Sequence, residues 1–243
     1  GLVGSEMCIR DSPGGVPDAD DTAGALVALR LLPEGGKAPS GVENGLRWLV
    51  GLTNKDGGMP TFCRGWGRLP FDRSCPDITA HALTAFSAWR ESVARSFRAS
   101  LDRRISEGIG YLTASQSLEG SWTPLWFGNQ SAPHMTNPLY GTCQVVKALR
   151  ALQAIPGSPA ARAMTRGAEW LLTAQNRDGT WGAAAGVAPT IEETALAVST
   201  LAEAPGRFCE AAGRGALGLV EMTDCGRLMK PSPIGLYFAA LWY

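Results

Sequence analysis

The sequence predicts an all-α protein built from helix hairpins. Three observations lead to this prediction: a helical unit that recurs with the same closing turn, a second set of amphipathic segments between these units, and no sustained alternation of polar and apolar residues. Hairpins of this kind either stack as an open solenoid or close into an α/α barrel, a toroid of helices. Glycine (30 residues) and proline (16 residues) gather between the helical segments, where tight turns need them.

The composition excludes several classes of protein. The 243 residues include 22 basic and 22 acidic side chains, so the formal net charge is zero, and only 18% of residues are charged. A neutral chain has no general electrostatic attraction to nucleic acid, and we expect no nucleic-acid partner. With 45% hydrophobic residues there is ample material for a core, which argues against disorder.

The first residues of the chain differ from the rest. The segment 1–12 (GLVGSEMCIRDS) lacks the charged-then-apolar layout of a signal peptide and resembles a translated sequencing adapter. We expect it to be a non-native leader, with the domain occupying 13–243. Six cysteines without a C-x-x-C pair allow disulfides but are more typical of a reduced, cytoplasmic protein in a chain this rich in core residues. No apolar run approaches the ~20 residues that span a bilayer.

The recurring unit is an apolar helix followed by a glycine turn. It occupies 45–59, 108–122 and 167–181, and each copy carries an aromatic anchor: Trp48, Tyr111 and Trp170. The last two copies end in the pattern Q-x3-G-x-W. We expect the glycine to adopt the positive φ that stops the helix, the glutamine to bond free backbone groups beside the turn, and the tryptophan to pack over it.

The second set of segments supplies the other helix of each hairpin. Apolar residues recur at i, i+3 and i+4 in four segments: 20–32, 77–89, 141–152 and 190–202.

These motifs and their order resemble the squalene–hopene cyclase group of class II triterpene cyclases. The Q-x3-G-x-W repeat is intact at 116–122 and 175–181 and degraded at 53–59, where threonine and methionine replace glutamine and tryptophan. Residues 18–23 (DADDTA) look like the group's D-x-D-D-T-A acid motif. Residues 77–81 (DITAH) resemble the segment that hydrogen-bonds the acid, and 137–142 (NPLYGT) resembles a tyrosine-glycine-threonine stretch of the group. The similarity extends over nearly all of 13–243.

The resemblance implies an α/α barrel that is one half of a two-barrel enzyme, with the active site between the barrels. It further implies squalene or another linear polyprenoid as substrate, no metal or organic cofactor, and peripheral contact with the membrane that holds the substrate. The partner barrel of such a parent protein is absent from this chain. We therefore expect the chain alone to have little activity and to expose apolar surface that favours aggregation.

The acid motif has chemistry of its own. Protonation of an alkene needs a strong acid in a dry pocket, and three aspartates within four residues cannot all ionise without cost, so a proton is retained and shared. The resemblance identifies Asp20 as the proton donor, flanked by Asp18 and Asp21 and polarised by His81 with Asp77. Asp77 and His81 are spaced i, i+4, which places both on one face of a helix.

Each of these residues also has an ordinary structural interpretation. Asp18 follows a proline and precedes an apolar run, as an N-cap does, and acidic residues suit a first helical turn. A histidine in an apolar helix is commonly a hydrogen-bonded core residue. The repeats around both segments favour the interpretation of these residues as a catalytic acid over the structural one.

The aromatic residues allow two interpretations as well. Aromatic faces stabilise carbocations by about 0.5–2 kcal/mol each, but core packing calls for the same side chains. Trp122 and Trp181 close the repeat turns and are assigned to structure. The resemblance makes Trp126 and Tyr140 candidates for binding substrate, and 128–136 between them is an insertion relative to hopene-forming cyclases.

Two other functions remain as alternatives. The first is a non-catalytic helical barrel that acts as a binding or scaffold module. The second is a zinc barrel like those of protein prenyltransferases, suggested by two cysteines and an aspartate near 62–77 together with His81, although their spacing matches no recognised zinc pattern. The loop also departs from hopene-forming cyclases, which leaves the product open. We predict no metal site.

Overall fold

The computed structural model describes residues 17–32, 40–61, 72–232 and 234–236. The expected leader 1–12, most of the loop that suggested zinc and the aromatic residues after 236 lie outside these ranges. Within them, no helix is long and apolar enough to cross a membrane. Four cysteines of the described ranges are free thiols: Cys75, Cys143, Cys209 and Cys225.

The helices form two layers. The inner layer comprises α2 (Ala19–Leu31), α4 (Pro76–Trp89), α6 (Pro138–Ala151) and α8 (Ile191–Leu201). The outer layer comprises α3 (Ser40–Leu52), α5 (Arg95–Ser115), α7 (Pro159–Thr173) and α9 (Arg207–Met222). The smaller elements are the 3-10 helices η2 (Arg90–Ser92) and η3 (Pro133–Met135) and the strands β1 (Phe127–Asn129) and β2 (Ile234–Leu236).

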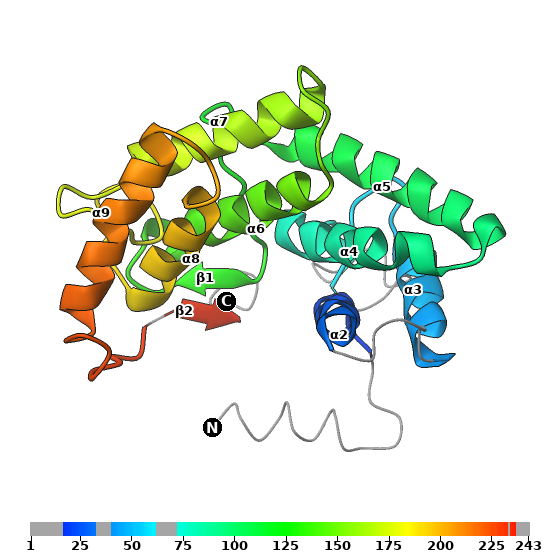
Figure 1. Ribbon diagram of the computed structural model, residues 1–243, viewed down its shortest axis with the longest axis horizontal. Helices are drawn as coiled ribbons and strands as arrows, with labels where there is room; N and C mark the ends of the chain where they lie inside the picture. Colours follow the sequence, from blue (N-terminus) through cyan, green and yellow to red (C-terminus); the bar gives the residue numbers. More distant parts are fainter. Residues whose placement is uncertain (1–16, 33–39, 62–71, 233, 237–243) are drawn as a thin grey trace.

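The chain alternates between the layers, so each inner helix and the next outer helix form a hairpin. Inner helices pack side by side in the order α2, α4, α6, α8, and outer helices follow the order α3, α5, α7, α9. Figure 1 shows the result as a curved, two-layered arc with α2 at one end and α8 and α9 at the other. Strands β1 and β2 pair antiparallel, Phe127 opposite Leu236, near the concave side.

The all-α prediction is confirmed, with two differences in detail. Helix α6 begins at Pro138 rather than at 141, because proline suits the first helical position and Asn137 caps it. Helix α9 was not predicted. It occupies the place of a fourth repeat, with Gly215 corresponding to Gly108 and Gly167, but the aromatic anchor three residues later is replaced by Gly218.

The repeat turns close in the same way in both intact copies. The Gln116 side-chain amide donates to the carbonyls of Gly120 (2.8 Å) and Ala163 (2.9 Å). Gln175 donates equally to Gly179 (2.8 Å) and Ala211 (2.9 Å). Each glutamine therefore joins its own turn to the outer helix of the next hairpin, which explains why this residue recurs.

The glycines of these turns meet two demands at once. Gly120 has φ +106° and Gly179 has φ +86°, a conformation that other residues rarely adopt. A Cβ atom on Gly120 would also lie 2.6 Å from the Arg166 carbonyl oxygen. The turn therefore packs directly against α7, and only glycine allows that approach.

The tryptophans of the repeats are structural, as predicted. Trp122 and Trp181 are almost fully buried, and their indole N–H groups donate to the carbonyls of Leu112 (2.7 Å) and Leu171 (2.8 Å). A threonine of the next inner helix accepts from the backbone N–H at this position of every repeat: Thr79 from Met59, Thr142 from Trp122 and Thr194 from Trp181. This bond fixes the register between each repeat and the inner helix that follows.

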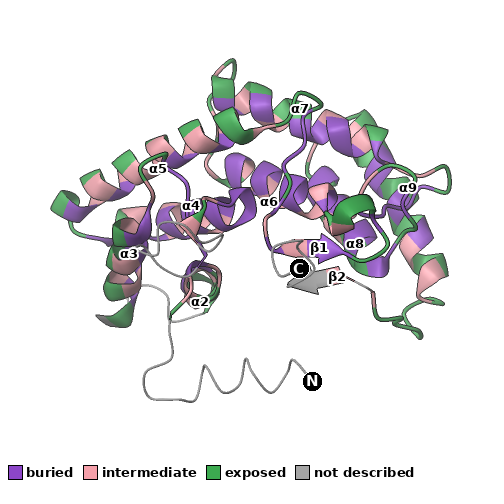
Figure 2. Ribbon diagram, turned by 180° about the vertical axis from the view of Figure 1, so that it is seen from behind, coloured by how far each residue is buried: buried purple, intermediate pink, exposed green. Residues whose placement is uncertain are grey.

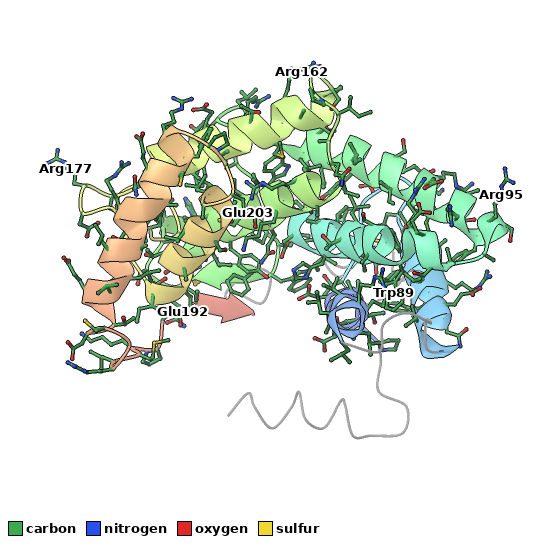
Figure 3. All side chains as sticks on the ribbon, in the orientation of Figure 1. Trp89, Arg95, Arg162, Arg177, Glu192 and Glu203 are labelled. Carbon is green, nitrogen blue, oxygen red and sulfur yellow. The ribbon has the colours of Figure 1, made fainter. Side chains whose placement is uncertain are left out.

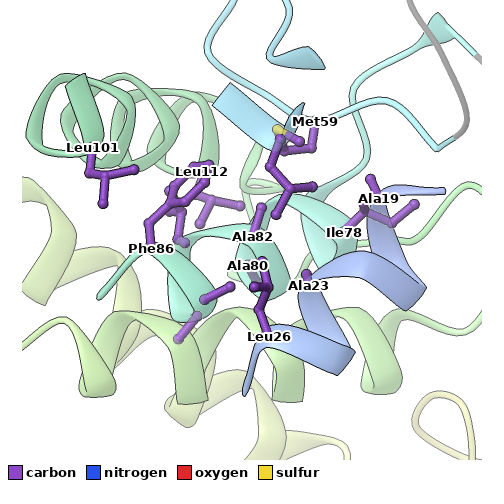
Figure 4. Packing of buried hydrophobic residues seen from close by; sticks show 14 of the residues in the cluster. Ala19, Ala23, Leu26, Met59, Ile78, Ala80, Ala82, Phe86, Leu101 and Leu112 are labelled. Atoms are coloured by element: carbon purple, nitrogen blue, oxygen red, sulfur yellow. The ribbon is translucent and has the colours of Figure 1, made fainter. Parts of the chain in front are cut away.

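The core lies between the two layers. Figure 2 shows buried residues on the faces that the layers turn toward each other and exposed residues along the outer helices. One large cluster extends from α2 to α7 and a second joins α6 to α9. Figure 4 shows Ala19, Ala23 and Leu26 of α2 beside Ile78 and Ala80 of α4. The small alanine side chains let these two helices approach closely, and this contact positions the residues described next.

Candidate active site

The acidic motif forms the first turn of α2. Asp18 is the N-cap, and its Oδ1 accepts a hydrogen bond from the Asp21 backbone N–H at 2.7 Å. The capping interpretation of Asp18 is therefore correct. This cap does not exclude a catalytic acid in the same motif. Capping engages Asp18, whereas the carboxylate of Asp20 extends to a neighbouring helix.

Asp20 and His81 are brought together although they lie 61 residues apart. His81 Nδ1 is hydrogen-bonded to Asp20 Oδ1, across the contact between α2 and α4. The two side chains keep 34% and 33% of their surface exposed. Both groups are thus accessible to a ligand as well as bonded to each other.

Asp77 lies one turn before His81 and is buried. Its Oδ1 accepts from the Cys75 thiol at 2.7 Å, and the Cys75 sulfur in turn accepts from the Leu125 backbone N–H at 3.2 Å. Asp77 acts on Asp20 and His81 by charge across space. Of the two residues predicted to polarise Asp20, His81 is hydrogen-bonded to it and Asp77 is bonded to Cys75 instead.

The electrostatics favour retention of protons in this cluster. Burial raises the pKa of Asp18 to about 6, and the charges of Asp21 and Asp20 add to the effect against the backbone hydrogen bonds. Burial also raises the pKa of Asp77. Burial lowers the pKa of His81, but the hydrogen bond that His81 donates to Asp20 and the charges of Asp20 and Asp77 outweigh it, and the pKa is raised overall.

Tyr140 borders the same cluster from α6. Burial raises its pKa, and the charges of Asp77 and Asp20 raise it further. The side chain of Gln144, one turn further along α6, raises the pKa of His81 and lowers that of Tyr140. Asp20, His81, Gln144 and Tyr140 therefore form a group of interacting polar side chains from three inner helices.

The other predicted aromatic residue lies differently. Trp126 is buried, with 4% of its surface exposed, and belongs to the large core cluster. Its neighbour Phe127, which was not predicted, stacks on Tyr140 with ring centroids 3.6 Å apart and ring planes 12° apart. The half-buried pair Phe127–Tyr140 thus presents aromatic surface beside the acid.

Sequence reasoning missed Gln144, and it did not assign Cys75 or Phe127 to this site. Helical spacing places Gln144 on the face of Tyr140, so this residue was within reach of the pattern. Phe127 reaches Tyr140 only because the segment 128–136 folds back, with a β-bridge between Gly128 and Thr136. No periodic pattern in the sequence predicts that this segment folds back. Among the described residues no cluster of histidine, cysteine and carboxylate side chains is arranged to hold a metal ion.

Comparison with known proteins identifies the family. Residues 14–221 match the model of the squalene-hopene cyclase C-terminal domain. The squalene–hopene cyclase of Bradyrhizobium diazoefficiens is 29% identical over 181 residues, which cover 68% of this chain and 25% of that protein. The copalyl diphosphate synthase of Streptomyces cyslabdanicus is 31% identical over 199 residues, covering 81% of this chain and 31% of that protein.

A solved structure shows the same architecture. The ent-copalyl diphosphate synthase from Streptomyces platensis aligns with a TM-score of 0.64 at 26% identity, over 86% of this chain and 36% of that one. The chain thus spans about a quarter to a third of the length of these relatives. The helical hairpins, the ordered motifs and the family match agree, and the chain belongs to the squalene–hopene cyclase C-terminal domain family of class II terpene cyclases.

Proposed function

We propose that this domain carries the acid of a class II terpene cyclase, which protonates a terminal alkene of squalene or a related linear polyprenoid and so starts cationic ring closure. The observation that carries the proposal is the hydrogen bond between Asp20 and His81 inside the aspartate cluster. This reaction needs a strong acid and aromatic surface close to it. The site supplies a carboxylic acid bonded to an imidazole, with further carboxylates and an aromatic pair beside it.

The first step is a proton transfer from Asp20. The π electrons of the terminal double bond form the new C–H bond, the neighbouring carbon becomes a tertiary cation, and Asp20 is left as a carboxylate. A protonated His81 stabilises that carboxylate by donating from Nδ1, and its raised pKa supports the protonated form. Because His81 engages Oδ1, the proton to be transferred is assigned to Oδ2 of Asp20.

The aromatic pair supports the later steps. A ring face within about 6 Å of a cation stabilises it by roughly 0.5–2 kcal/mol. Phe127 and Tyr140 are half-buried beside the acid and are suited to this role. Trp126, which the resemblance nominates, supports Phe127 as its chain neighbour and from within the core.

The reaction also requires exclusion of water, because water would quench both the acid and the cation. Within the described residues Asp20 keeps 34% of its side chain exposed. We propose that a second α-barrel of the parent chain covers this face, that the isolated domain has little activity, and that the enzyme works in the cytoplasm in peripheral contact with the membrane that holds its substrate. The much greater length of the relatives supports the second barrel.

A second substrate class is favoured by two of the comparisons. Relatives named copalyl diphosphate synthase align over 81% and 86% of the chain. A linear prenyl diphosphate has the same terminal alkene as squalene, so the same acid serves both substrates. The two classes are separated by offering each to the enzyme.

The decisive assay uses the complete parent protein with squalene, or with a linear C20 prenyl diphosphate, dispersed in detergent. We expect a cyclic isomer of one substrate from the wild type, and a loss of at least about 100-fold from Asp20→Asn, consistent with removal of an essential acid. Asp224→Asn, an exposed carboxylate far along the chain, is the matched control and should retain full activity. Cyclic product formed equally by Asp20→Asn would refute the proposal.

A further inference from the structure

A fully buried carboxylate lies outside the acid cluster. Glu193, in the first turn of α8, has no exposed surface. Burial raises its pKa against the hydrogen bonds that it accepts. Burying a carboxylate costs free energy unless its oxygens accept hydrogen bonds. The groups that donate to Glu193 therefore indicate its role.

The side chains that bond Glu193 are buried, and their hydrogen bonds are short. Oε1 accepts from the side-chain amides of Asn129 and Asn137, each at 2.8 Å, and Oε2 accepts from the Thr190 hydroxyl at 2.8 Å. Asn129 and Asn137 are themselves fully buried. One carboxylate therefore joins the start of α8 to Asn129, near the beginning of the insertion 128–136, and to Asn137, directly after it.

Both asparagines lie in the segments that carry the aromatic pair. Asn137 caps α6, and its Oδ1 accepts from the Tyr140 backbone N–H at 3.0 Å. Asn129 ends β1, two residues after Phe127, and its Oδ1 accepts from the Ser131 N–H at 2.8 Å. The two rings that stack at 3.6 Å thus come from two segments that Glu193 bonds together.

Neighbouring Glu192 shows that this arrangement is specific to Glu193. Glu192, labelled in Figure 3, is exposed and accepts a hydrogen bond from the Ser232 hydroxyl, near β2. Of these two glutamates, Glu193 is the one whose side chain bonds β1 and the N-cap of α6. Its position cannot be a consequence of helix capping alone, since the Thr190 cap needs only the Glu193 backbone N–H.

We propose that Glu193 is a positioning residue which, through Asn129 and Asn137, holds the Phe127–Tyr140 pair beside the acid cluster. The proposal rests on the proposed cyclase function for its catalytic consequence, because a misplaced pair no longer covers the same carbon of the cation. Loss of Glu193 should therefore change which product forms and how fast, more than how tightly substrate binds.

The positioning itself is tested on the chain without any substrate. The chain contains four tyrosines, so fluorine NMR of 3-fluorotyrosine-labelled protein gives few signals, and Tyr140→Phe assigns the one from Tyr140. We expect Glu193→Ala to shift or broaden the Tyr140 signal and Glu193→Gln to restore it, because the glutamine carbonyl accepts from both asparagines and its amide donates to Thr190. Leu201→Ala, a buried control on the same helix, should lower Tm without moving this signal.

The catalytic consequence is tested on the complete parent protein. Glu193→Ala should lower kcat about tenfold and alter the product ratio, with KM changed less than about twofold, and Glu193→Gln should restore both. Should Glu193→Ala not fold, Asn129→Ala carries the same predictions. An unmoved Tyr140 signal, or an equal movement in Leu201→Ala, overturns the positioning role. If the wild type forms no cyclic product, the cyclase proposal fails and the NMR result alone decides the positioning.

Discussion

At the scale of single residues, the site combines a structural and a chemical use of the same motif. Asp18 caps α2 and thereby leaves Asp20 to bond His81. Because Asp18, Asp20 and Asp21 lie close together, ionising each of them costs more free energy than ionising an isolated carboxylate. The imidazole of His81 offsets this cost for Asp20. This division predicts different effects of substituting each member.

Asp18→Asn should stabilise the domain at neutral pH. Asparagine caps a helix as well as aspartate does, so the variant keeps the cap but removes a charge that the folded state disfavours. The pKa of Asp18 is raised from 3.8 to about 6, so ionisation destabilises the fold as pH rises through this interval. Allowing for partial exposure, we expect Tm about 2–4 °C above wild type near pH 7.5.

The difference should vanish below about pH 3, where Asp18 is protonated in both folded and unfolded chains. Tm measured by circular dichroism between these two conditions checks the prediction. A variant whose Tm falls at neutral pH, or whose advantage is the same at both pH values, would contradict it.

His81 should titrate above its ordinary value of 6.5, because Asp20 and Asp77 favour the imidazolium. The chain has only two histidines, so proton NMR follows each one separately. Asp20→Asn should lower the His81 pKa, since it removes the bonded charge. The stability that this pair contributes is present below the unfolded pKa of histidine and is lost as pH rises through the folded pKa. A His81 pKa that Asp20→Asn leaves unchanged would show that the two groups do not interact in solution.

At the scale of secondary-structure elements, each repeat turn connects two successive hairpins. The glutamine bonds a carbonyl of its own turn and a carbonyl of the following outer helix, and the tryptophan fills the space beneath. The first repeat uses Thr53 instead, which bonds the Leu49 carbonyl within its own helix and the Met59 sulfur in its own turn.

Gln175→Leu should lower the free energy of unfolding by about 1–3 kcal/mol, because the carbonyls of Gly179 and Ala211 lose their side-chain donor. Urea denaturation gives this value. The matched control is Gln130→Leu, an exposed glutamine, which should change stability by less than about 0.5 kcal/mol. Equal effects of the two substitutions would mean that the turn does not depend on these bonds.

The sequence predicted the elements best where one residue type has one physical task. The Q-x3-G-x-W turns were predictable because glycine, glutamine and tryptophan each meet a separate demand there. Helix α9 was missed because Gly218 replaces the aromatic anchor. Gly215 nevertheless keeps the close contact of the repeat, since a Cβ atom at this position would lie 2.4 Å from the Trp181 ring. The Asp20–His81 pair was predictable from motifs, whereas Phe127 and Glu193 depend on how 128–136 folds, which no local pattern encodes.

At the scale of the whole molecule, the hairpins build an arc with the acid at the start of its inner helices. Asp20 and Asp77 both stand two residues after the N-cap positions of α2 and α4, so the repeat places polar groups at the same end of successive inner helices. This end can gather an acid, its partner and aromatic groups from helices distant in sequence. The family match over 14–221 agrees with this arrangement.

The central claim is that Asp20 delivers the proton that starts cyclisation, and isotope labelling tests it most directly. Asp20 exchanges its proton with solvent before each turnover, so the complete parent protein acting in D2O should place one deuterium in a terminal methyl group of the cyclic product, the group formed from the protonated alkene carbon. Mass spectrometry and NMR locate the label. Cyclic product without deuterium at that methyl group would contradict the account.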